Sequence, residues 1–286
     1  MSRRAYWELT KPRLSLLAVL TAVAGYLAAV PGGGASWTTL GWLTLGTALA
    51  AGACGALNQW MERGPDARMR RTAGRPLPSG ALRPSQALVF GSVLLAAGLA
   101  AVGHGANFAA MAMTAATAVT YLFLYTPLKC RTPWCTVAGS LPGALPVLIG
   151  STARTGTVGA FDLAIFGLLF CWQVPHFMGL AVLWRDDYAA GGFRVATVED
   201  PSGESAARQS SLFLAGTLAA SAAPVLLDPS LVAYAAVAIL AGIGFARLGL
   251  RFHRGATRAE AARPFFLFSL LYLPLVLLAL VLDRMF

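Results

Sequence analysis

The sequence predicts an all-α protein in which nine transmembrane helices form a single domain, residues 1–286. Three observations lead to this prediction. The chain is 57% hydrophobic and only 12% charged, which is unlike an ordinary soluble domain. Nine apolar stretches run through it, and most approach the roughly 20 residues that cross about 30 Å of hydrocarbon. The loops between these stretches alternate between strongly basic and nearly uncharged.

The nine apolar stretches give the expected spans in chain order. They cover residues 14–30, 37–61, 85–104, 106–126, 137–152, 158–184, 209–227, 231–250 and 264–282. The fifth is the shortest, and it contains Pro142 and Pro146. We do not expect the first to be a cleaved signal peptide, because it is long and no small-residue cleavage site precedes a soluble domain.

The distribution of basic residues predicts the orientation of the bundle in a cell membrane. Of the 22 Lys and Arg residues, all except Arg154 and Arg284 fall in the N-terminal segment and one set of loops. Basic loops stay on the cytoplasmic side of a membrane. The N-terminus is therefore expected inside, and an odd number of spans puts the C-terminus outside. A net charge of +10 in such a protein is mostly topogenic, and an anionic substrate explains the remainder better than nucleic acid does.

Two cytoplasmic loops, residues 62–84 and 185–208, stand out because each exceeds 20 residues. Long loops in a compact domain are usually functional. They also contain most of the acidic residues: Glu62, Asp66, Asp186, Asp187, Glu199, Asp200 and Glu204. The spans before them end in polar side chains, which are costly in a membrane unless they face a cavity or a partner. We therefore expect the chemistry at this end.

Asn58, Glu62 and Asp66 are spaced at i, i+4 and i+8, so on a helix they share one face. Oxygen ligands of this kind suit Mg²⁺, which binds a few carboxylates together with substrate phosphates. Arginines that can grip phosphate oxygens follow in the same loop: Arg68, Arg70, Arg71 and Arg75. The alternative is a solvated, salt-bridged helix end. Pro65 should kink or end the helix near Arg63, which weakens the shared-face argument for Asp66.

Two further segments carry candidate residues. Tyr125 and Lys129, four apart at the next cytoplasmic helix end, are able to reach a phosphate; an aromatic belt with a snorkelling lysine is the alternative. His176 is the one histidine in the interior of an expected span, since His104 stands at the very end of the third span and looks like a loop residue. It is either a structural residue or a group that binds a ligand or transfers a proton.

At these residues the chain closely resembles the protohaem IX farnesyltransferase (haem O synthase) family, which belongs to the UbiA superfamily of membrane prenyltransferases. The matching segments are TKPR (10–13), NQWMER (58–63), DARMRRT (66–72), RPLPSG (75–80), YTPLK (125–129), RTPW (131–134), PGALP (142–146), WQVPHF (172–177), DY (187–188) and GG (191–192). They follow the family's order over nearly the whole chain.

The resemblance implies a UbiA-like bundle of nine helices around a cavity open to cytoplasm and lipid. It implies transfer of the farnesyl group of farnesyl diphosphate to a vinyl group of haem B, with water addition. By motif, Asn58, Glu62, Asp66 and Asp187 would bind Mg²⁺. Arg13, Arg70, Tyr125 and Lys129 would contact the diphosphate, and His176 would lie on the haem side. Whether a haem A synthase or an oxidase assembly partner binds stays open.

Three features depart from the superfamily pattern. Many members carry Asp-x3-Asp in the second loop, whereas Leu183 stands four residues before Asp187. Gly64 and Pro65 interrupt the first motif, and Cys130 replaces an arginine that often follows the lysine.

Two other functions compete with this interpretation. One is a UbiA-type transferase acting on a quinone precursor or a chlorophyll-like acceptor. The other is a haem or metal transporter, which would place polar residues through the full depth of the membrane.

Overall fold

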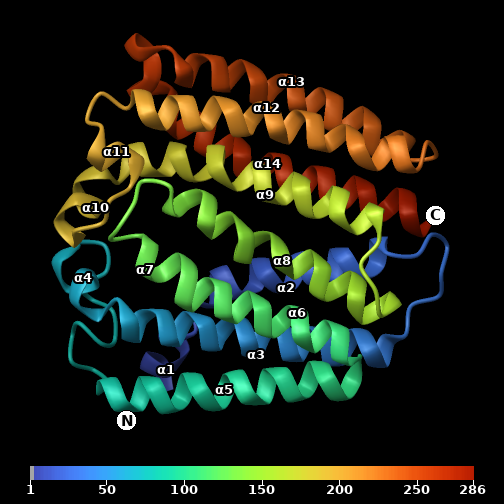
Figure 1. Cartoon of the computed structure of the whole chain (residues 1–286), viewed down its shortest axis with the longest axis horizontal. Helices are drawn as coiled ribbons and strands as arrows, with labels where there is room; N and C mark the ends of the chain where they lie inside the picture. The colour runs from blue at the N-terminus through green and yellow to red at the C-terminus, as the bar shows by residue number, and fades with distance from the viewer. Residues whose placement is uncertain (1–2) are drawn as a thin grey trace.

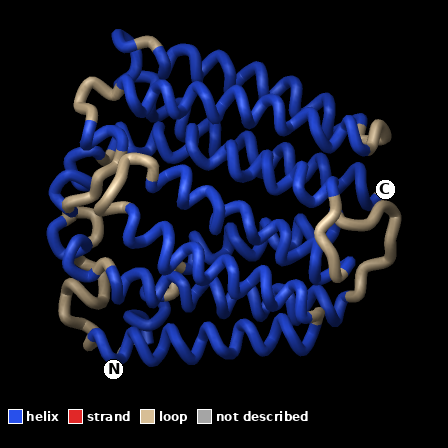
Figure 2. Tube along the Cα trace, in the orientation of Figure 1, coloured by secondary structure: helices blue, strands red, loops and turns tan. Residues whose placement is uncertain are grey.

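The computed structural model describes residues 3–286, and every regular element within that range is a helix (Figures 1 and 2). The long helices run side by side, so the connecting loops gather at the two ends of the bundle (Figure 2). One end holds the short helices α4 (Arg63–Arg68), α10 (Arg185–Gly191) and α11 (Ala196–Glu199), and the C-terminus lies at the opposite end (Figure 1). The all-α prediction is confirmed.

Each of the nine expected spans corresponds to one long helical segment. They are α2 (Pro12–Ala28), α3 (Trp37–Met61), α5 (Pro84–Gly105), the continuous segment Phe108–Leu128, α8 (Cys135–Thr155), α9 (Ala160–Leu183), α12 (Glu204–Leu227), α13 (Val232–His253) and α14 (Arg258–Met285). Within the described residues, eight are long and apolar enough to cross a membrane, and α2 is a shorter apolar helix of 17 residues. The protein is therefore a polytopic membrane protein, and its first span, not its fifth, is the shortest.

Local sequence signals explain several helix ends. Pro12 and Pro84 stand in the first turns of α2 and α5, where a missing N–H costs nothing. Asn107 caps the segment Phe108–Leu128, and its Oδ1 accepts a hydrogen bond of 2.9 Å from Ala110 N. That segment is built from α6 (Phe108–Val119), a π-helical turn η1 (Thr120–Tyr125) and α7 (Thr126–Leu128). Two further short helices, α1 (Arg3–Leu9) and η2 (Gly255–Thr257), lie at the end of the bundle that holds α4, α10 and α11.

α8 is the most enclosed of the long helices, and it packs against α2, α6 and α9. Glycine allows its close approach to α2. A Cβ atom on Gly150 would lie 1.8 Å from Ala22 O, and one on Gly25 would lie 2.1 Å from Val147 O. Small residues let membrane helices pack backbone against backbone. α8 keeps its helical path through Pro142 and Pro146 because proline is tolerated where neighbouring helices enclose the backbone.

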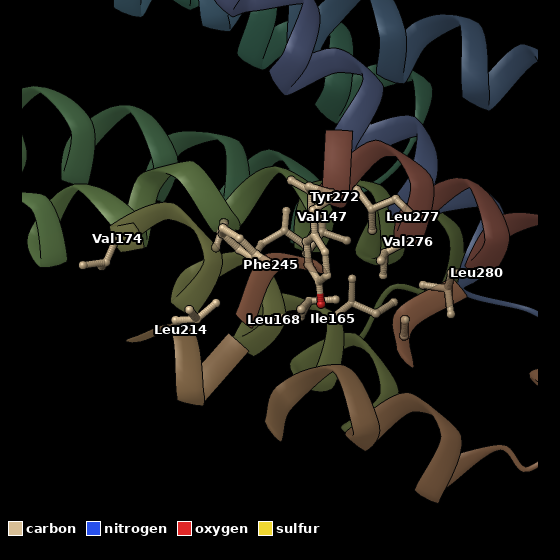
Figure 3. Packing of buried hydrophobic residues seen from close by; sticks show 14 of the residues in the cluster. Val147, Ile165, Leu168, Val174, Leu214, Phe245, Tyr272, Val276, Leu277 and Leu280 are labelled. Atoms are coloured by element: carbon tan, nitrogen blue, oxygen red, sulfur yellow. The ribbon is translucent and has the colours of Figure 1, made fainter. Parts of the chain in front are cut away.

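The largest apolar core lies where α8, α9, α13 and α14 meet (Figure 3). Figure 3 shows Val147, Ile165, Leu168, Phe245 and Tyr272 converging there, and all five side chains are buried. Lipid tails are as apolar as these side chains, so close van der Waals packing, and not removal from water, stabilises the contact between these helices. This core holds the C-terminal half of the chain together. The clustered polar residues lie elsewhere, at the end of the bundle that holds α4, α10 and α11.

The two arginines outside the basic loops are both bound at the opposite end. Arg284 Nε donates to Ala28 O at 2.9 Å, and its Nη1 lies 2.6 Å from Asp228 Oδ2. The Arg154 guanidinium lies 5.1 Å from the Tyr26 ring centroid. Arg284 therefore links the end of α14 to the end of α2, which lie far apart in the sequence. These two exceptions to the charge asymmetry have structural roles.

Candidate functional site

The three oxygen-bearing residues at the end of α3 keep a common face. Glu62 N donates to Asn58 O at 2.9 Å, and Asp66 N donates to Glu62 O at 2.8 Å, so the helical spacing continues across the boundary between α3 and α4. α3 ends at Met61, as the expected break near Arg63 requires. Pro65 then falls in the first turn of a new helix, where it needs no N–H. All three side chains are buried.

Each of these side chains contacts a cation. Lys129 Nζ lies 2.8 Å from Glu62 Oε1, and Arg75 Nη1 lies 2.8 and 2.7 Å from the two oxygens of Asp66. Lys11 Nζ donates to Asn58 Oδ1 at 2.5 Å. Buried carboxylates are tolerated because cations compensate them, and removal of either partner would leave an uncompensated charge.

The turn between α1 and α2 brings Lys11 to this cluster. Gln59 Nε2 donates to Leu9 O at 3.0 Å, and a Cβ on Gly55 would lie 2.9 Å from Thr10 O, so the turn sits directly on α3. Lys11 has a left-handed backbone, with φ 48°, the one positive φ outside glycine in residues 3–286. Strained backbone of this kind concentrates at functional sites. No role for Lys11 was predicted from the sequence, although its place directly before Pro12 at the start of a span was a usable signal.

The cluster also shifts the pKa values of its two lysines, Lys11 and Lys129. The pKa of Lys11 falls to about 7, chiefly because burial removes water from its ammonium and also because Arg75 and Lys129 lie nearby. Burial by itself lowers the pKa of Lys129, but the adjacent Glu62 carboxylate, together with Tyr121 and Tyr188, outweighs burial and raises that pKa above its ordinary value. Perturbed groups of this kind cluster at functional sites.

The second long loop packs against the first. α10 contacts α4, and the two helices lie together at one end of the bundle (Figure 1). Arg68 Nη2 donates to Gly191 O at 2.8 Å, and Arg71 N donates to Asp187 Oδ2 at 3.2 Å. The Asp187 carboxylate therefore meets the backbone of the first loop. No group of three or more His, Cys, Asp or Glu side chains arranged for a metal ion occurs in the described part of the chain.

The remaining diphosphate candidates divide into two kinds. Lys129 lies 4.5 Å from the Tyr125 ring centroid, so the structure brings this pair to Glu62 and the first motif. Lys129 O also accepts a hydrogen bond from Arg194 N at 2.7 Å, which links the loop after α7 to the second long loop, residues 185–208. Arg13 and Arg70 are exposed, and neither forms a hydrogen bond or ion pair with the three motif residues within the part of the chain that the structure describes.

His176 faces a different neighbour. Its Nδ1 lies 2.8 Å from Ser269 Oγ on α14, and its ring stacks on Trp172 with centroids 4.7 Å apart. Phe266 of α14 lies 5.0 Å away on another side. His176 is thus packed between α9 and α14, apart from the cluster at the end of α3, and its function stays a prediction.

The residues at the end of α3 fit the chemistry of Mg²⁺. Their donors are all oxygens, which hard divalent cations prefer. Glu62 Oε1 is buried with an ammonium beside it but no aligned hydrogen-bond donor among the described residues. A buried carboxylate oxygen without such a donor is open to another ligand. The donor set therefore suits a magnesium ion, with cations close by for an anionic ligand.

Comparison with known proteins agrees with this geometry. Residues 18–271 match the UbiA prenyltransferase family. A protohaem IX farnesyltransferase of Opitutus terrae is 44% identical over 98% of this chain and 95% of its own length. Those of Solibacter usitatus and Salinibacter ruber are 40% and 41% identical over 98% and 97% of this chain, and over 99% and 98% of their own lengths.

Solved structures share the fold at low sequence identity. One from a study of digeranylgeranylglyceryl phosphate synthase superimposes with a TM-score of 0.82 at 16% identity, covering 99% of this chain and 98% of that one. A UbiA homologue of Archaeoglobus fulgidus, bound to DMAPP and Mg²⁺, gives a TM-score of 0.68 at 17% identity, covering 96% and 98%. The chain therefore belongs to the UbiA prenyltransferase family, on the branch of the protohaem IX farnesyltransferases.

Proposed function

We propose that residues 1–286 act as one prenyltransferase domain that moves the farnesyl group of farnesyl diphosphate onto a vinyl group of haem B. Water addition then gives haem O, and diphosphate is released. One structural observation carries this proposal: two buried carboxylates, Glu62 and Asp66, are paired with Lys129 and Arg75 at one end of an apolar bundle. The full-length similarity to protohaem IX farnesyltransferases supports haem B as the acceptor.

The reaction begins with ionisation of the allylic diphosphate. The bond between farnesyl C1 and oxygen breaks, and both electrons leave with the diphosphate. The vinyl π electrons then form the new carbon–carbon bond. Water adds to the cation left beside the porphyrin and loses a proton. Negative charge therefore develops on the diphosphate, and fixed positive groups accelerate this step.

The cations of the cluster are suited to that stabilisation. Lys129 and Arg75 exchange their carboxylates for phosphate oxygens when the substrate binds, and Arg13, Arg70 and Tyr125 contribute further contacts. Asn58, Glu62 and Asp66, with Asp187 from the second loop, would hold Mg²⁺. A bound magnesium ion supplies positive charge where the diphosphate departs. The apolar bundle excludes water from the farnesyl cation.

We assign His176 to the haem side. Its Nδ1 is engaged by Ser269 Oγ, so Nε2 is the nitrogen through which it would ligate iron or relay the proton of the added water. The aromatic rings of Trp172 and Phe266 beside it suit a flat, apolar macrocycle. We place the protein in the cell membrane, with the N-terminus and the site cytoplasmic and the C-terminus outside.

The proposal is tested with the purified chain, labelled farnesyl diphosphate, Mg²⁺ and one of two acceptors. Haem B should yield haem O, and the yield should vanish when EDTA removes the metal. 4-Hydroxybenzoate should yield nothing. Prenylation of 4-hydroxybenzoate alone would overturn the acceptor assignment, and transfer to neither acceptor would overturn the proposed reaction.

A further inference from the structure

The π-helical turn η1 changes the surroundings of Thr126. Pro127 follows it, and a proline ring crowds the carbonyl four residues earlier, which belongs to Phe123. The helix widens instead, and Thr126 N donates to the carbonyl of Tyr121, five residues back. The Thr126 hydroxyl donates to the same carbonyl at 2.8 Å. Widened turns of this kind occur often at functional sites.

The direction of that hydroxyl bond fixes what Thr126 offers to its other neighbour. A threonine hydroxyl has one proton, and here the carbonyl of Tyr121 takes it. Thr126 Oγ1 therefore presents lone pairs toward α3. Asn58 Nδ2 donates to that oxygen at 2.9 Å across 68 residues of sequence. Both side chains are buried, with exposed fractions of 0% for Asn58 and 4% for Thr126.

The hydroxyl thereby determines which way the Asn58 amide points. An amide offers a donor at one end and an acceptor at the other. With its NH₂ group held by Thr126, its oxygen must face the opposite side, where Lys11 Nζ donates to it. An ammonium has donors only, so the Lys11 side chain can hydrogen-bond to the amide only when the amide oxygen faces it. Without Thr126, Lys11 is the one remaining contact among the described residues that holds the amide in this orientation.

We propose that Thr126 is a positioning residue, which holds the Asn58 amide with its oxygen directed toward the Mg²⁺–diphosphate site; this rests on the proposed function. A metal at Asn58 Oδ1 takes the place that Lys11 occupies. Once Lys11 has moved, the hydrogen bond from Asn58 Nδ2 to Thr126 is the contact that keeps the amide from turning. An NH₂ group directed at a divalent cation would repel it.

The test measures binding of farnesyl thiodiphosphate, an analogue that does not ionise readily, to the full chain in detergent. Each variant is titrated twice, once in EDTA and once with saturating Mg²⁺. Thr126→Val keeps the shape but removes the hydroxyl. It should leave binding in EDTA unchanged, because arginines and lysines still grip the diphosphate. The gain in affinity that Mg²⁺ confers should fall about tenfold, which corresponds to about 1.4 kcal/mol.

Two companion variants separate positioning from stability. Thr126→Ser retains the hydroxyl and should restore the Mg²⁺-dependent gain. Thr114→Val is the matched control, because Thr114 is equally buried on the same segment, and its hydroxyl donates only to Ala110 O, at 2.8 Å, among the bonds of the described residues. It should leave both titrations unchanged.

Three outcomes would overturn the inference. Equal weakening of Thr126→Val in EDTA and in Mg²⁺ would mean a general structural defect, as would the same loss in Thr114→Val. An unrestored Thr126→Ser would show that the hydroxyl is not what matters. A wild-type chain that binds the analogue equally well with and without Mg²⁺ would instead overturn the proposed metal site itself, and this inference with it.

Discussion

Lys129 Nζ lies 2.8 Å from Glu62 Oε1, so a cation expected to bind diphosphate is paired with a carboxylate expected to bind metal. Arg75 and Asp66 repeat this relationship one helical turn away. These two pairs are therefore neutral before substrate arrives, which limits the cost of burying their charges. Entry of a metal–diphosphate pair requires only an exchange of partners: the metal takes the carboxylates and the phosphates take the cations.

The first prediction concerns these carboxylates. Glu62→Gln and Asp66→Asn should each lower turnover by about two orders of magnitude or more, the scale on which single charge-stabilising groups act. Haem O formation, measured on protein that still elutes as a folded species, checks this. Glu199→Gln is the control, since its ion pair with Arg194 at the same end of the molecule is exposed and should matter little. Wild-type turnover in Asp66→Asn would remove Asp66 from the site.

The second prediction separates the two halves of the reaction at His176. His176→Ala should lose haem O formation while farnesyl diphosphate still binds with Mg²⁺ at near-normal affinity, because the imidazole lies apart from the cluster at the end of α3. Ser269→Ala removes only its hydrogen-bond partner and should cause a smaller loss. Haem binding and product formation that both survive His176→Ala would make this histidine a packing residue between α9 and α14.

The third prediction is topological. Reporter fusions at Gly34, His104 and Phe286 should all report the extracytoplasmic side, whereas a fusion at Ser79 in the first long loop should report the cytoplasm. The two arginines at the end expected outside do not weaken this expectation, because Arg284 and Arg154 are engaged by Asp228 and Tyr26. A cytoplasmic signal from Phe286 would mean that the number of spans is even.

The order of the long helices was predictable because hydrophobic length is a strong signal in a membrane protein, and eight of the nine expected spans are long and apolar enough to cross a membrane. The ends of the helices were harder to predict. α14 begins at Arg258, six residues before the apolar run that marked it, because a charged first turn continues the helix without any change in period. The common face of Asn58, Glu62 and Asp66 also followed from spacing alone.

The partners of these residues could not be predicted from spacing. Lys11, Arg75 and Thr126 reach the cluster from three separate segments, and only the packing of the α1–α2 turn and of η1 on α3 brings them together. His176 was equally ambiguous, because a histidine inside a span has the same sequence signature whether it faces a cavity or a neighbouring helix. Position along the chain gives the depth of a side chain in the membrane, but the direction in which it points depends on packing.

The fourth prediction tests the packing of α2, the helix that begins directly after Lys11, against α8. α2 is the shortest long helix, and its contact with α8 depends on glycine, because a Cβ on Gly150 would meet Ala22 O at 1.8 Å. Gly150→Ala must push the two backbones apart, so the melting temperature in detergent should fall by about 5 °C or more. Because α2 starts next to Lys11, affinity for farnesyl diphosphate should fall together with the melting temperature.

Gly167→Ala is the matched control: this glycine lies within α9 with nothing within 4 Å of the added methyl group, and the change should be neutral or slightly stabilising. Equal melting temperatures for the two variants would show that α2 and α8 are not held together by this contact.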